Sequence, residues 1–599
     1  MRRIRTNLLA LMTMVTTSAI AAPTIEFEVS FKEPQAHYAE VSMEISGFRK
    51  DYIDVKMPVW TPGSYLVREY AKHVEGVEAC DAAGEHLAVK KIDKNTWRIQ
   101  SDKSEKVTFN YRIYGFEISV RTNFIDDSHA FLSSPSTFMY VDGLTEQPID
   151  VTVIPHTGWA TVSTGLEPVE GKPNTFRAAD FDTLVDSPIE VGNQDVITFE
   201  AAGVPHEIAM VGGGNYDRER LKADAKRIIE EATAVFGTNP NKRYVFIVHN
   251  YRSGGGGLEH INSTVLGASR NGYQPESAYV GFLGLVAHEY FHLWNVKRLR
   301  PVELGPFDYD KENYTSLLWV MEGFTAYYDN LLLRRSNFLN ETSYLQALSN
   351  DVSAVENRSG SRVQSAAEAS FDAWIKYYRP DENSANTTVS YYNKGALLGM
   401  LLDVKILAAT KGEKRLDDAL RAAYEKFYIK ENRGFEADEF RAVIEEVAGT
   451  SVADIFEAAQ AVGPLDYNHY LRGVGYELID QTEGLSVPAL GFGTSVSDGR
   501  VMVSSVTRGT GAWDGGINVR DEILAINGER LDAAGRELNR LMQTVAVGDR
   551  LDILLARDGK IREITITLTE DTRGSFRILP MPDATPEQAR LGEIWLSSK

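Results

Sequence analysis

Residues 279–296 read YVGFLGLVAHEYFHLWNV, and the string HEYFH occupies positions 288–292 within them. The apolar residues before this string surround the predicted helix on every side, which is typical of a buried helix. Residues four apart lie on one face of a helix, so His288 and His292 are placed to bind one metal ion. Glu289 lies beside that ion, where a carboxylate can take a proton from attacking water. The stretch predicts a metallohydrolase, against the alternative of a surface helix with two unrelated histidines.

A third metal ligand should follow, because a hydrolytic zinc usually takes three protein ligands. The next predicted helix, residues 316–333, is strongly apolar and carries one acid in its first half, Glu322. A carboxylate buried among large apolar side chains needs a partner. We therefore predict one zinc ion per chain, held by Glu322 with His288 and His292. The alternative for Glu322 is an ordinary helix carboxylate.

Upstream of these helices, the apolar run 244–248 predicts a strand that ends in the glycine loop SGGGGLEH, residues 253–260. Gly256 and Gly257 allow the backbone to come close to a ligand. Glu259 follows them and is placed to meet a cation or the amine of a substrate. A mobile glycine loop without such a role is the alternative.

Downstream, the string SYYNKGALLGMLLD, residues 390–403, opens a long apolar helix with two tyrosines at its start. Tyr392 is placed to donate its hydroxyl to the oxyanion that forms when water attacks a carbonyl. Tyr391 is the substitute candidate for this role and for substrate contact. Two core tyrosines are the alternative.

Together these strings resemble the gluzincin aminopeptidases, zinc peptidases of the thermolysin-like clan. That group has, in this order, a G-G-x-E loop, the H-E-x-x-H string, a glutamate in W-x-x-E-G-F and a Y-x-K-G string. Within it, the wording HEYFHLWNVKRLRP, GGLEH and EGFTAYY is similar to the glycyl aminopeptidase family, whose members add a PDZ domain. The resemblance covers nearly the whole chain after residue 22.

The resemblance implies a zinc aminopeptidase that prefers small N-terminal residues such as Gly and Ala. It implies that Glu259 binds the free α-amino group of a peptide, and that a small mixed sheet precedes the metal helix while a helical bundle follows. The chain departs from the broader pattern at Ala326, where an acid often orients a zinc histidine. In this chain, Asp329 or a residue from elsewhere is expected to orient the zinc-binding histidine instead.

The composition narrows the class of protein. At 599 residues the chain is too long for one core, so two to four domains are expected. A net charge of −21 argues against nucleic acid or an anionic membrane as partner. Cys80 is the only cysteine, which excludes an intramolecular disulfide and disfavours thiol catalysis or a cysteine-bound zinc.

Residues 1–22 have the pattern of a secretory signal peptide. Three arginines precede the apolar stretch 8–15, and the small-residue string AIA at 19–21 resembles a cleavage site. The apolar part is short for a membrane span, and no other stretch reaches the required length. We therefore expect a periplasmic or secreted protein with no membrane span after leader removal; an uncleaved anchor is the alternative.

Between the leader and the zinc strings, residues 23–195 alternate apolar and polar positions, as in Ile25, Phe27, Val29 and Phe31. This pattern predicts a β-rich domain built as an antiparallel sandwich. Its string WTPGSYLVREY, residues 60–70, favours a structural corner over a loop that reaches the active site. Helices dominate from 196 to 473, the predicted catalytic domain, and all four zinc-site strings lie there.

Residues 484–569 return to a strand pattern with one helix near 533–544. The strings PALGFGTSV and GGINVRDEILAINGERL resemble a PDZ domain. That resemblance implies that backbone N–H groups around Leu490, Gly491 and Phe492 capture a peptide C-terminus, with a purely structural module as the alternative. In the tail, 570–599, Thr585 and Gln588 form a capping-box pattern that predicts a short docked helix.

The expected fold is thus multidomain α+β, with an N-terminal β-sandwich, a mostly helical thermolysin-like domain and a C-terminal PDZ domain. The expected function is zinc-dependent release of N-terminal residues from peptides with a free N-terminus. Two other functions remain open at this stage. One is an endopeptidase to which the PDZ domain brings peptides, and the other is a catalytically inactive peptide-binding protein on the same frame.

Overall fold

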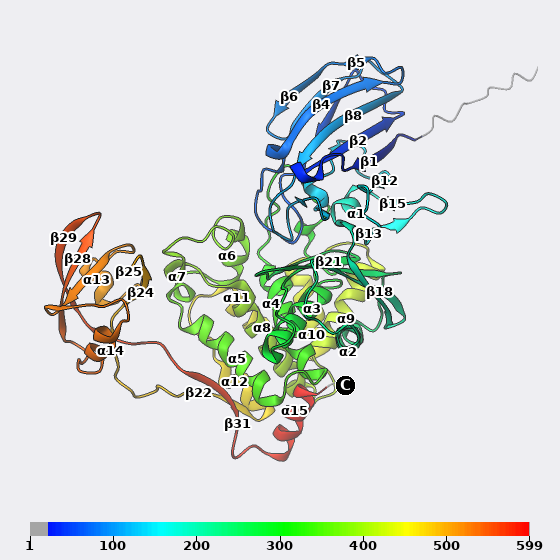
Figure 1. The fold of residues 1–599 in the computed structure, drawn as a ribbon. Helices are drawn as coiled ribbons and strands as arrows, with labels where there is room; N and C mark the ends of the chain where they lie inside the picture. Colours follow the sequence, from blue (N-terminus) through cyan, green and yellow to red (C-terminus); the bar gives the residue numbers. More distant parts are fainter. Residues whose placement is uncertain (1–21, 598–599) are drawn as a thin grey trace, which may run out of the picture.

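The computed structural model of the chain describes residues 22–597. It has an N-terminal β domain, a central domain with a small sheet and many helices, and a small C-terminal lobe that stands apart from the central domain (Figure 1). The multidomain α+β class is confirmed. The predicted leader, apart from Ala22, lies outside the described residues.

The N-terminal domain packs one large sheet against a smaller one. The large sheet has eight strands, and alternate residues such as Phe27, Val41 and Phe109 point into a core shared with Trp97 of the smaller sheet. The large sheet comprises β14 (Glu167–Pro168), β15 (Thr175–Ala178), β12 (Ile149–Ile154), β1 (Thr24–Ser30), β2 (Tyr38–Ser46), β8 (Lys106–Tyr114), β4 (Val74–Asp81) and β5 (His86–Leu87). Its pairs are antiparallel except β1 with β12, which is parallel.

Two four-stranded sheets complete this domain. The one that shares the core comprises β11 (Tyr140–Val141), β3 (Tyr52–Lys56), β7 (Thr96–Gln100) and β6 (Val89–Asp93). The other comprises β13 (Thr161–Thr164), β16 (Ile189–Gly192), β10 (Ala130–Leu132) and β9 (Phe124–Ile125).

The central domain begins with a five-stranded mixed sheet, as the resemblance implies. The sheet runs β17 (Asp195–Ala201), β18 (Val204–Val211), β19 (Tyr244–Tyr251), β21 (Ser263–Ser269) and β20 (Gly257–Glu259). The pairs β18–β19 and β19–β21 are parallel, and the two outer pairs are antiparallel. The short strand β20 therefore forms one edge of the sheet.

The helices that follow build one continuous apolar core. They include α2 (Arg218–Phe236), α3 (Glu276–Phe291), α4 (Leu318–Arg335), α5 (Glu341–Glu356), α6 (Ala366–Phe371), α8 (Tyr391–Ala409), α9 (Leu416–Ala423), α10 (Ala437–Ala448), α11 (Ala453–Gln460) and α12 (Tyr467–Leu471). The helix predicted over 279–296 ends earlier than expected, because α3 stops at Phe291 and the chain turns at Val296, whose φ is 143°. His292 caps the helix and keeps a helical conformation.

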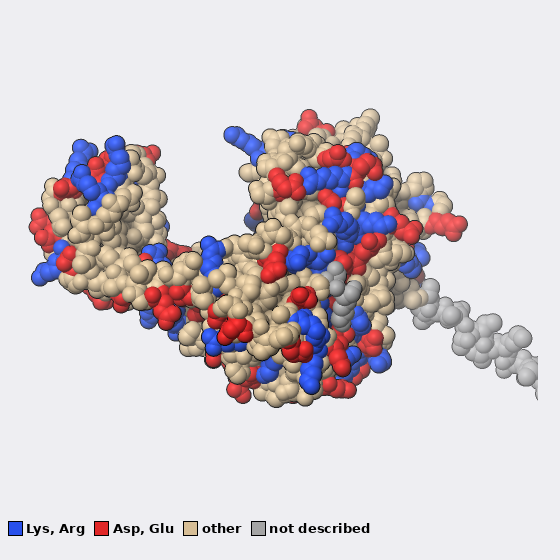
Figure 2. Space-filling model, turned by 90° about the horizontal axis from the view of Figure 1, so that it is seen from below, with Lys and Arg blue, Asp and Glu red and all other residues tan. Residues whose placement is uncertain are grey.

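The C-terminal lobe has its own apolar core and a sheet of β24 (Phe492–Ser497), β25 (Arg500–Val506), β26 (Glu522–Ile526), β28 (Arg550–Arg557) and β29 (Lys560–Thr567), with α14 (Arg536–Met542) beside it. An open recess separates this lobe from the main body, and acidic and basic side chains are interspersed over the face shown (Figure 2). Among residues 22–597, no helix is both long and apolar enough to cross a membrane.

The lobe is attached at both ends to the central domain. The strand that leads into it, β22 (Tyr476–Asp480), pairs with the strand that leaves it, β31 (Phe576–Pro580). After β31 the chain forms α15 (Pro586–Leu596), which Thr585 caps with Gln588. Trp595 Nε1 donates to the hydroxyl of Tyr327 on α4, at 2.9 Å, so the last helix belongs to the core of the central domain.

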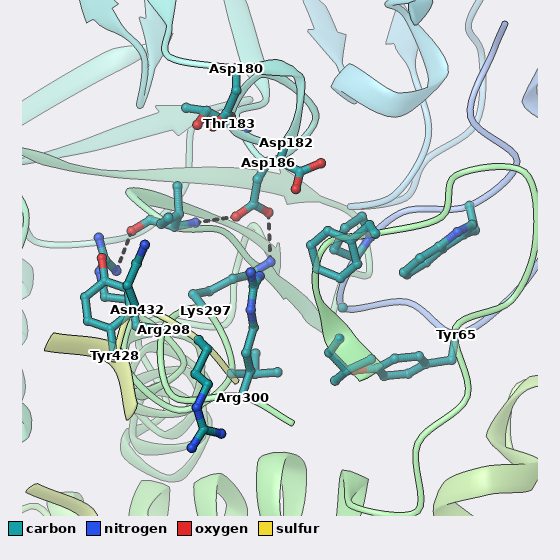
Figure 3. Close-up of a pocket in the computed structure, with 18 residues that line it drawn as sticks. Tyr65, Asp180, Asp182, Thr183, Asp186, Lys297, Arg298, Arg300, Tyr428 and Asn432 are labelled. Carbon is teal, nitrogen blue, oxygen red and sulfur yellow. Dashed lines mark hydrogen bonds and ion pairs between the residues drawn. The ribbon is translucent and has the colours of Figure 1, made fainter. Parts of the chain in front are cut away.

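A buried ion pair fixes the junction between the N-terminal and central domains. Asp186 follows α1 (Phe181–Val185), and its carboxylate accepts from Lys297 Nζ and from the backbone N–H of Ile261, both at 2.7 Å (Figure 3). It also lies 3.0 Å from Nδ1 of His260. Burial alone would raise the pKa of Asp186, but Lys297 and His260 hold it below its usual range. A cavity of about 300 Å³ lies at this junction.

We predict that Asp186→Asn lowers the free energy of unfolding by about 3 kcal/mol at pH 7, because Lys297 is left buried without a counter-charge. Denaturant titration of the variant and the wild type measures the difference. Since the folded-state pKa of Asp186 is depressed, its contribution is present above the unfolded pKa of about 4 and is lost as the pH falls through the folded pKa.

The matched control is Asp51→Asn, which removes an exposed partner of Lys103 and should change stability by less than about 1 kcal/mol. An equal loss in both variants would contradict the role of the buried pair.

Candidate metal centre

The side chains of His288, His292 and Glu322 meet at one point between α3 and α4. The two Nε2 atoms lie 3.2 Å apart, and Oε2 of Glu322 lies 3.5 Å from Nε2 of His288 and 3.1 Å from that of His292. Zinc binds imidazole nitrogen and carboxylate oxygen at about 2.0–2.2 Å in tetrahedral geometry, which separates neighbouring ligand atoms by roughly 3.3 Å. The three atoms therefore fit the ligand set of one zinc ion and leave a fourth position open.

Each histidine is oriented by a bond to its other ring nitrogen. His288 Nδ1 lies 3.1 Å from Oδ2 of Asp329, and His292 Nδ1 lies 2.7 Å from the backbone carbonyl of Asn295. Such partners fix the ring and select the nitrogen that faces the metal. The acid missing at Ala326 is thus replaced by Asp329, one turn further along α4.

The turn after α3 is tied directly to α4. Asn295 Nδ2 donates to the backbone carbonyls of Val320 and Met321, at 3.2 and 2.9 Å, and to the hydroxyl of Thr325. The same asparagine thereby positions His292 through its carbonyl and Glu322 through the backbone before it. Because α3 ends at Phe291, Asn295 lies in the turn and can position both His292 and Glu322.

Two glycines let α4 and α8 come into backbone contact. A Cβ atom on Gly323 would overlap Cα of Gly395, and a Cβ atom on Gly395 would overlap the carbonyl of Trp319. Gly323 follows Glu322, and Gly395 lies one helical turn after Tyr392. The contact therefore brings Glu322 and Tyr392 to the same cavity. It also explains why the E-G and Y-x-K-G strings carry a glycine at these positions.

Glu289 is buried beside the ligands and binds none of the groups around it. Its Oε2 has no hydrogen-bond partner among residues 22–597, and its carboxylate lies against Gly257 of β20. Burial raises the pKa of Glu289 to about 7, with the nearby His288 opposing the shift. A carboxylate with this pKa is well matched to accepting a proton near neutral pH.

Glu259, the last residue of β20, is also buried, and its Oε1 has no hydrogen-bond partner in the part of the chain that the structure describes. One of its oxygens lies within 4.8 Å of both an oxygen of Glu289 and a nitrogen of His292. On its other side the carboxylate lies against Gly63, where a Cβ atom would overlap it. The 60–70 string, predicted to be a structural corner, thus also walls the site: Gly63 lines the cleft, and Trp60 and Tyr65 pack into the central core.

The two tyrosines at the start of α8 differ in their access to the cleft. Tyr392 lines the cavity, and its ring stacks on His288 with centroids 6.3 Å apart. Tyr391 is fully buried, stacks on Tyr392 at 4.7 Å and does not line the cavity, so the structure does not bring it to the substrate side. Burial raises the pKa of both hydroxyls, and the charge of Glu322 adds to the shift in both.

A cleft of about 830 Å³ joins these groups. Gly256 and Gly257 line it, and the other described residues that line it include four acids and a single arginine, Arg121. Arg121 comes from the N-terminal domain and donates to the carbonyl of Gly257 at 3.1 Å. No local pattern marked it, because its loop lies more than 130 residues before the first zinc-site string and reaches the cleft only through domain packing.

In the C-terminal lobe, Leu490, Gly491 and Phe492 form the loop that enters β24. They line a cavity of about 560 Å³ together with Glu356 and Arg362 of the central domain. The strand β24 ends the sheet order, so its outer edge is free of a partner strand within the lobe.

Comparisons with known families agree with this arrangement. Residues 26–193 match the peptidase M61 N-terminal domain, residues 281–398 match M61 glycyl aminopeptidase and residues 488–568 match a PDZ domain. A crystal structure described as an aminopeptidase N family protein from Idiomarina loihiensis is 30% identical, with a TM-score of 0.88 over 96% of this chain and 100% of that one. The chain belongs to the M61 glycyl aminopeptidase family. It is accordingly a zinc metallopeptidase, and the predicted family is confirmed.

More distant solved structures include an M1 zinc metallopeptidase from Deinococcus radiodurans, 12% identical with a TM-score of 0.47 over 74% of this chain and 95% of that one. Yeast LTA4 hydrolase, solved with bestatin, is 13% identical with a TM-score of 0.46 over 76% and 69%. No curated protein matches the chain in sequence.

For this M61 member we predict that His292→Ala loses stoichiometric zinc, because two ligands retain the ion poorly. Glu289→Gln should keep the zinc and lower kcat by about 10²–10⁴, since only the proton acceptor is removed. Metal content by mass spectrometry and single-substrate kinetics measure both. His86→Ala, on an exposed strand, is the control that keeps metal and activity; full zinc in His292→Ala would overturn the ligand set.

Proposed function

We propose that the enzyme is an aminopeptidase that releases small N-terminal residues, Gly and Ala first, from peptides with a free α-amino group. The observation that carries this proposal is the buried carboxylate of Glu259 beside the metal centre, one oxygen of which bonds to none of the described residues. A buried carboxylate without a partner is costly, and the ammonium group of a substrate supplies the missing charge.

The spacing selects the first peptide bond. The amine nitrogen and the first carbonyl carbon of a peptide are separated by two covalent bonds, or about 2.5 Å. With the amine on Glu259, the first carbonyl therefore falls within reach of a metal held by His292, because the two side chains lie within 4.8 Å. The second carbonyl lies one residue further on.

The N-terminal domain disfavours an endopeptidase. Gly63 lies against the carboxylate of Glu259, and Tyr65 and Trp60 pack behind it into the core. Chain extending beyond the amine would have to displace this loop. The proposed preference for Gly and Ala is based on the family. The proposal that a peptide enters the cleft with its N-terminus first is based on the position of the 60–70 loop.

The residues present supply the remaining steps of hydrolysis. A zinc ion held by the three ligands would polarise the scissile carbonyl and acidify a water molecule. Glu289 accepts the proton of the attacking water and passes it to the departing amine. Tyr392 donates its hydroxyl to the oxyanion. A catalytically inactive binding protein is disfavoured, because Glu289 and Glu259 would then be buried at a cost with nothing to offset it.

Two further roles belong to this proposal. Residues 1–22 direct the protein to the periplasm or to secretion, and the loop at Gly491 binds the C-terminus of a peptide. Leader cleavage in a fractionated host cell and peptide titration of the full chain test them.

We predict that Tyr392→Phe lowers kcat by about 10²–10³ and leaves KM nearly unchanged, because one oxyanion donor is lost only in the transition state. Steady-state kinetics on a glycyl anilide measures both constants. Tyr391→Phe is the matched control on the adjacent residue; if that variant shows the loss and Tyr392→Phe does not, the assignment of the donor is reversed.

For the amine site, acetylation of the peptide should abolish cleavage by removing the charge that pairs with Glu259. Glu259→Ala should raise KM strongly for free peptides and narrow the gap between free and acetylated ones. Glu28→Ala, exposed on β1, is the control that changes neither. Rapid internal cleavage of acetylated peptides by the wild type would refute the aminopeptidase assignment.

A further inference from the structure

Arg121 is the only lysine or arginine among the described residues that line the zinc cleft. The cleft is otherwise acidic, because Glu259, Glu289, Glu322 and Asp329 all face it. A metal and an amine balance part of this charge. Neither accounts for an arginine that enters from a different domain.

The backbone of Arg121 is held in place, and its side chain has donors to spare. Its carbonyl accepts from the hydroxyl of Tyr70 at 3.0 Å and from that of Ser133 at 3.2 Å. Of its five N–H donors, one is used by the carbonyl of Gly257. Its Nε is buried with no partner among the described residues.

Arg121 lies on the free edge of β20. Along that strand the carbonyls of Gly256 and Leu258 accept bonds from the β21 side, from Gly267 N and the hydroxyl of Thr264. Carbonyls alternate in direction along a strand, so that of Gly257 points away from β21, toward the cleft and Arg121. An extended peptide can run along this edge.

The spacing along β20 places Arg121 at the far end of a very short substrate. Gly257 and Glu259 are two residues apart in a strand, which is roughly 7 Å. A peptide whose amine meets Glu259 and which runs antiparallel to β20 reaches Gly257 with its second or third residue. In a dipeptide or tripeptide, that residue carries the C-terminal carboxylate.

We propose that Arg121 binds the C-terminal carboxylate of dipeptides and tripeptides, so that this enzyme is tuned to short free peptides and not to the ends of long chains. The inference rests on the aminopeptidase function proposed above and names its substrate class. A carboxylate in this acidic cleft is repelled unless a cation meets it, and a guanidinium bonds a carboxylate through two parallel N–H donors.

The test compares tripeptides such as Gly-Ala-Ala with a free or an amidated C-terminus, using the zinc-loaded full chain. Wild type should hydrolyse the free acid with a kcat/KM about 10- to 100-fold above that of the amide, the span expected of a charge-assisted bond. Arg121→Gln should bring this ratio close to one, and Arg121→Lys should restore part of it.

Arg68→Gln is the matched control. Arg68 donates to the hydroxyl of Ser64 and does not line the cleft. Burial lowers the pKa of Arg68, and the charge of Arg121 adds to this shift because the two guanidinium groups lie near one another. The ratio should survive in this variant. An equal drop in Arg68→Gln would mean that net charge and not contact sets the ratio, and would overturn the proposal.

The ratio of kcat/KM for the free acid to that for the amide is measured within one variant, so a loss of folded protein lowers both values equally. A partly destabilised Arg121→Gln variant therefore still gives a valid ratio. If the wild type hydrolyses acid and amide equally, the carboxylate site is wrong while the aminopeptidase function stands, provided that acetylated peptides remain uncut. If acetylated peptides are cut, the function itself fails whatever the ratio. A ratio that persists in Arg121→Gln also overturns the role of Arg121.

Discussion

The active centre depends on one backbone contact, between Gly323 on α4 and Gly395 on α8. No side chain separates the helices there, so the residues beside the two glycines are brought to one cavity. Any larger residue would push the helices apart and move Glu322 away from His288 on α3 and from His292 at the end of that helix. Close packing of this kind transmits such displacements, because a protein core has little space in which to absorb them.

The charges of the site are a second constraint, because its buried carboxylates are not all matched by nearby cations. Glu289 and Glu259 each have a buried oxygen that no residue among 22–597 bonds. In contrast, Glu322 lies against both histidines and Asp329 against His288. The pKa of Glu322 is lowered to about 2: burial opposes this shift, and the charges of His292 and His288 outweigh it. Burying these two carboxylates lowers stability, and in the proposed reaction the attacking water at Glu289 and the substrate amine at Glu259 would supply the missing partners. Groups with strongly perturbed pKa values cluster at functional sites.

Much of this was predictable from the sequence, because short-range patterns carry it. Helix spacing placed His288 and His292, the need for a partner placed Glu322, and the glycine loop placed Glu259. What remained hidden depends on contacts between distant segments. The end of α3 at Phe291 follows from the bonds of Asn295 to α4, and Arg121 reaches the cleft only because two domains pack together. The 60–70 loop shows both kinds of feature. Its Pro-Gly turn could be predicted from the sequence, whereas the contact of Gly63 with Glu259 could not.

The last helix of the chain is also a part of the central core. Trp595 bonds Tyr327, whose hydroxyl donates to Asp403 on α8 at 2.7 Å, so α15 closes over the same two helices that carry Glu322 and Tyr392. A chain that emerges from the ribosome in order can complete the N-terminal sandwich early, but the part of α4 and α8 that α15 covers stays exposed until residues 586–596 are made. The intervening PDZ lobe, with its separate core, can fold during that interval. Closure of the catalytic domain therefore waits for α15, and a chain that stops at residue 585 would leave that surface open to aggregation or to proteases.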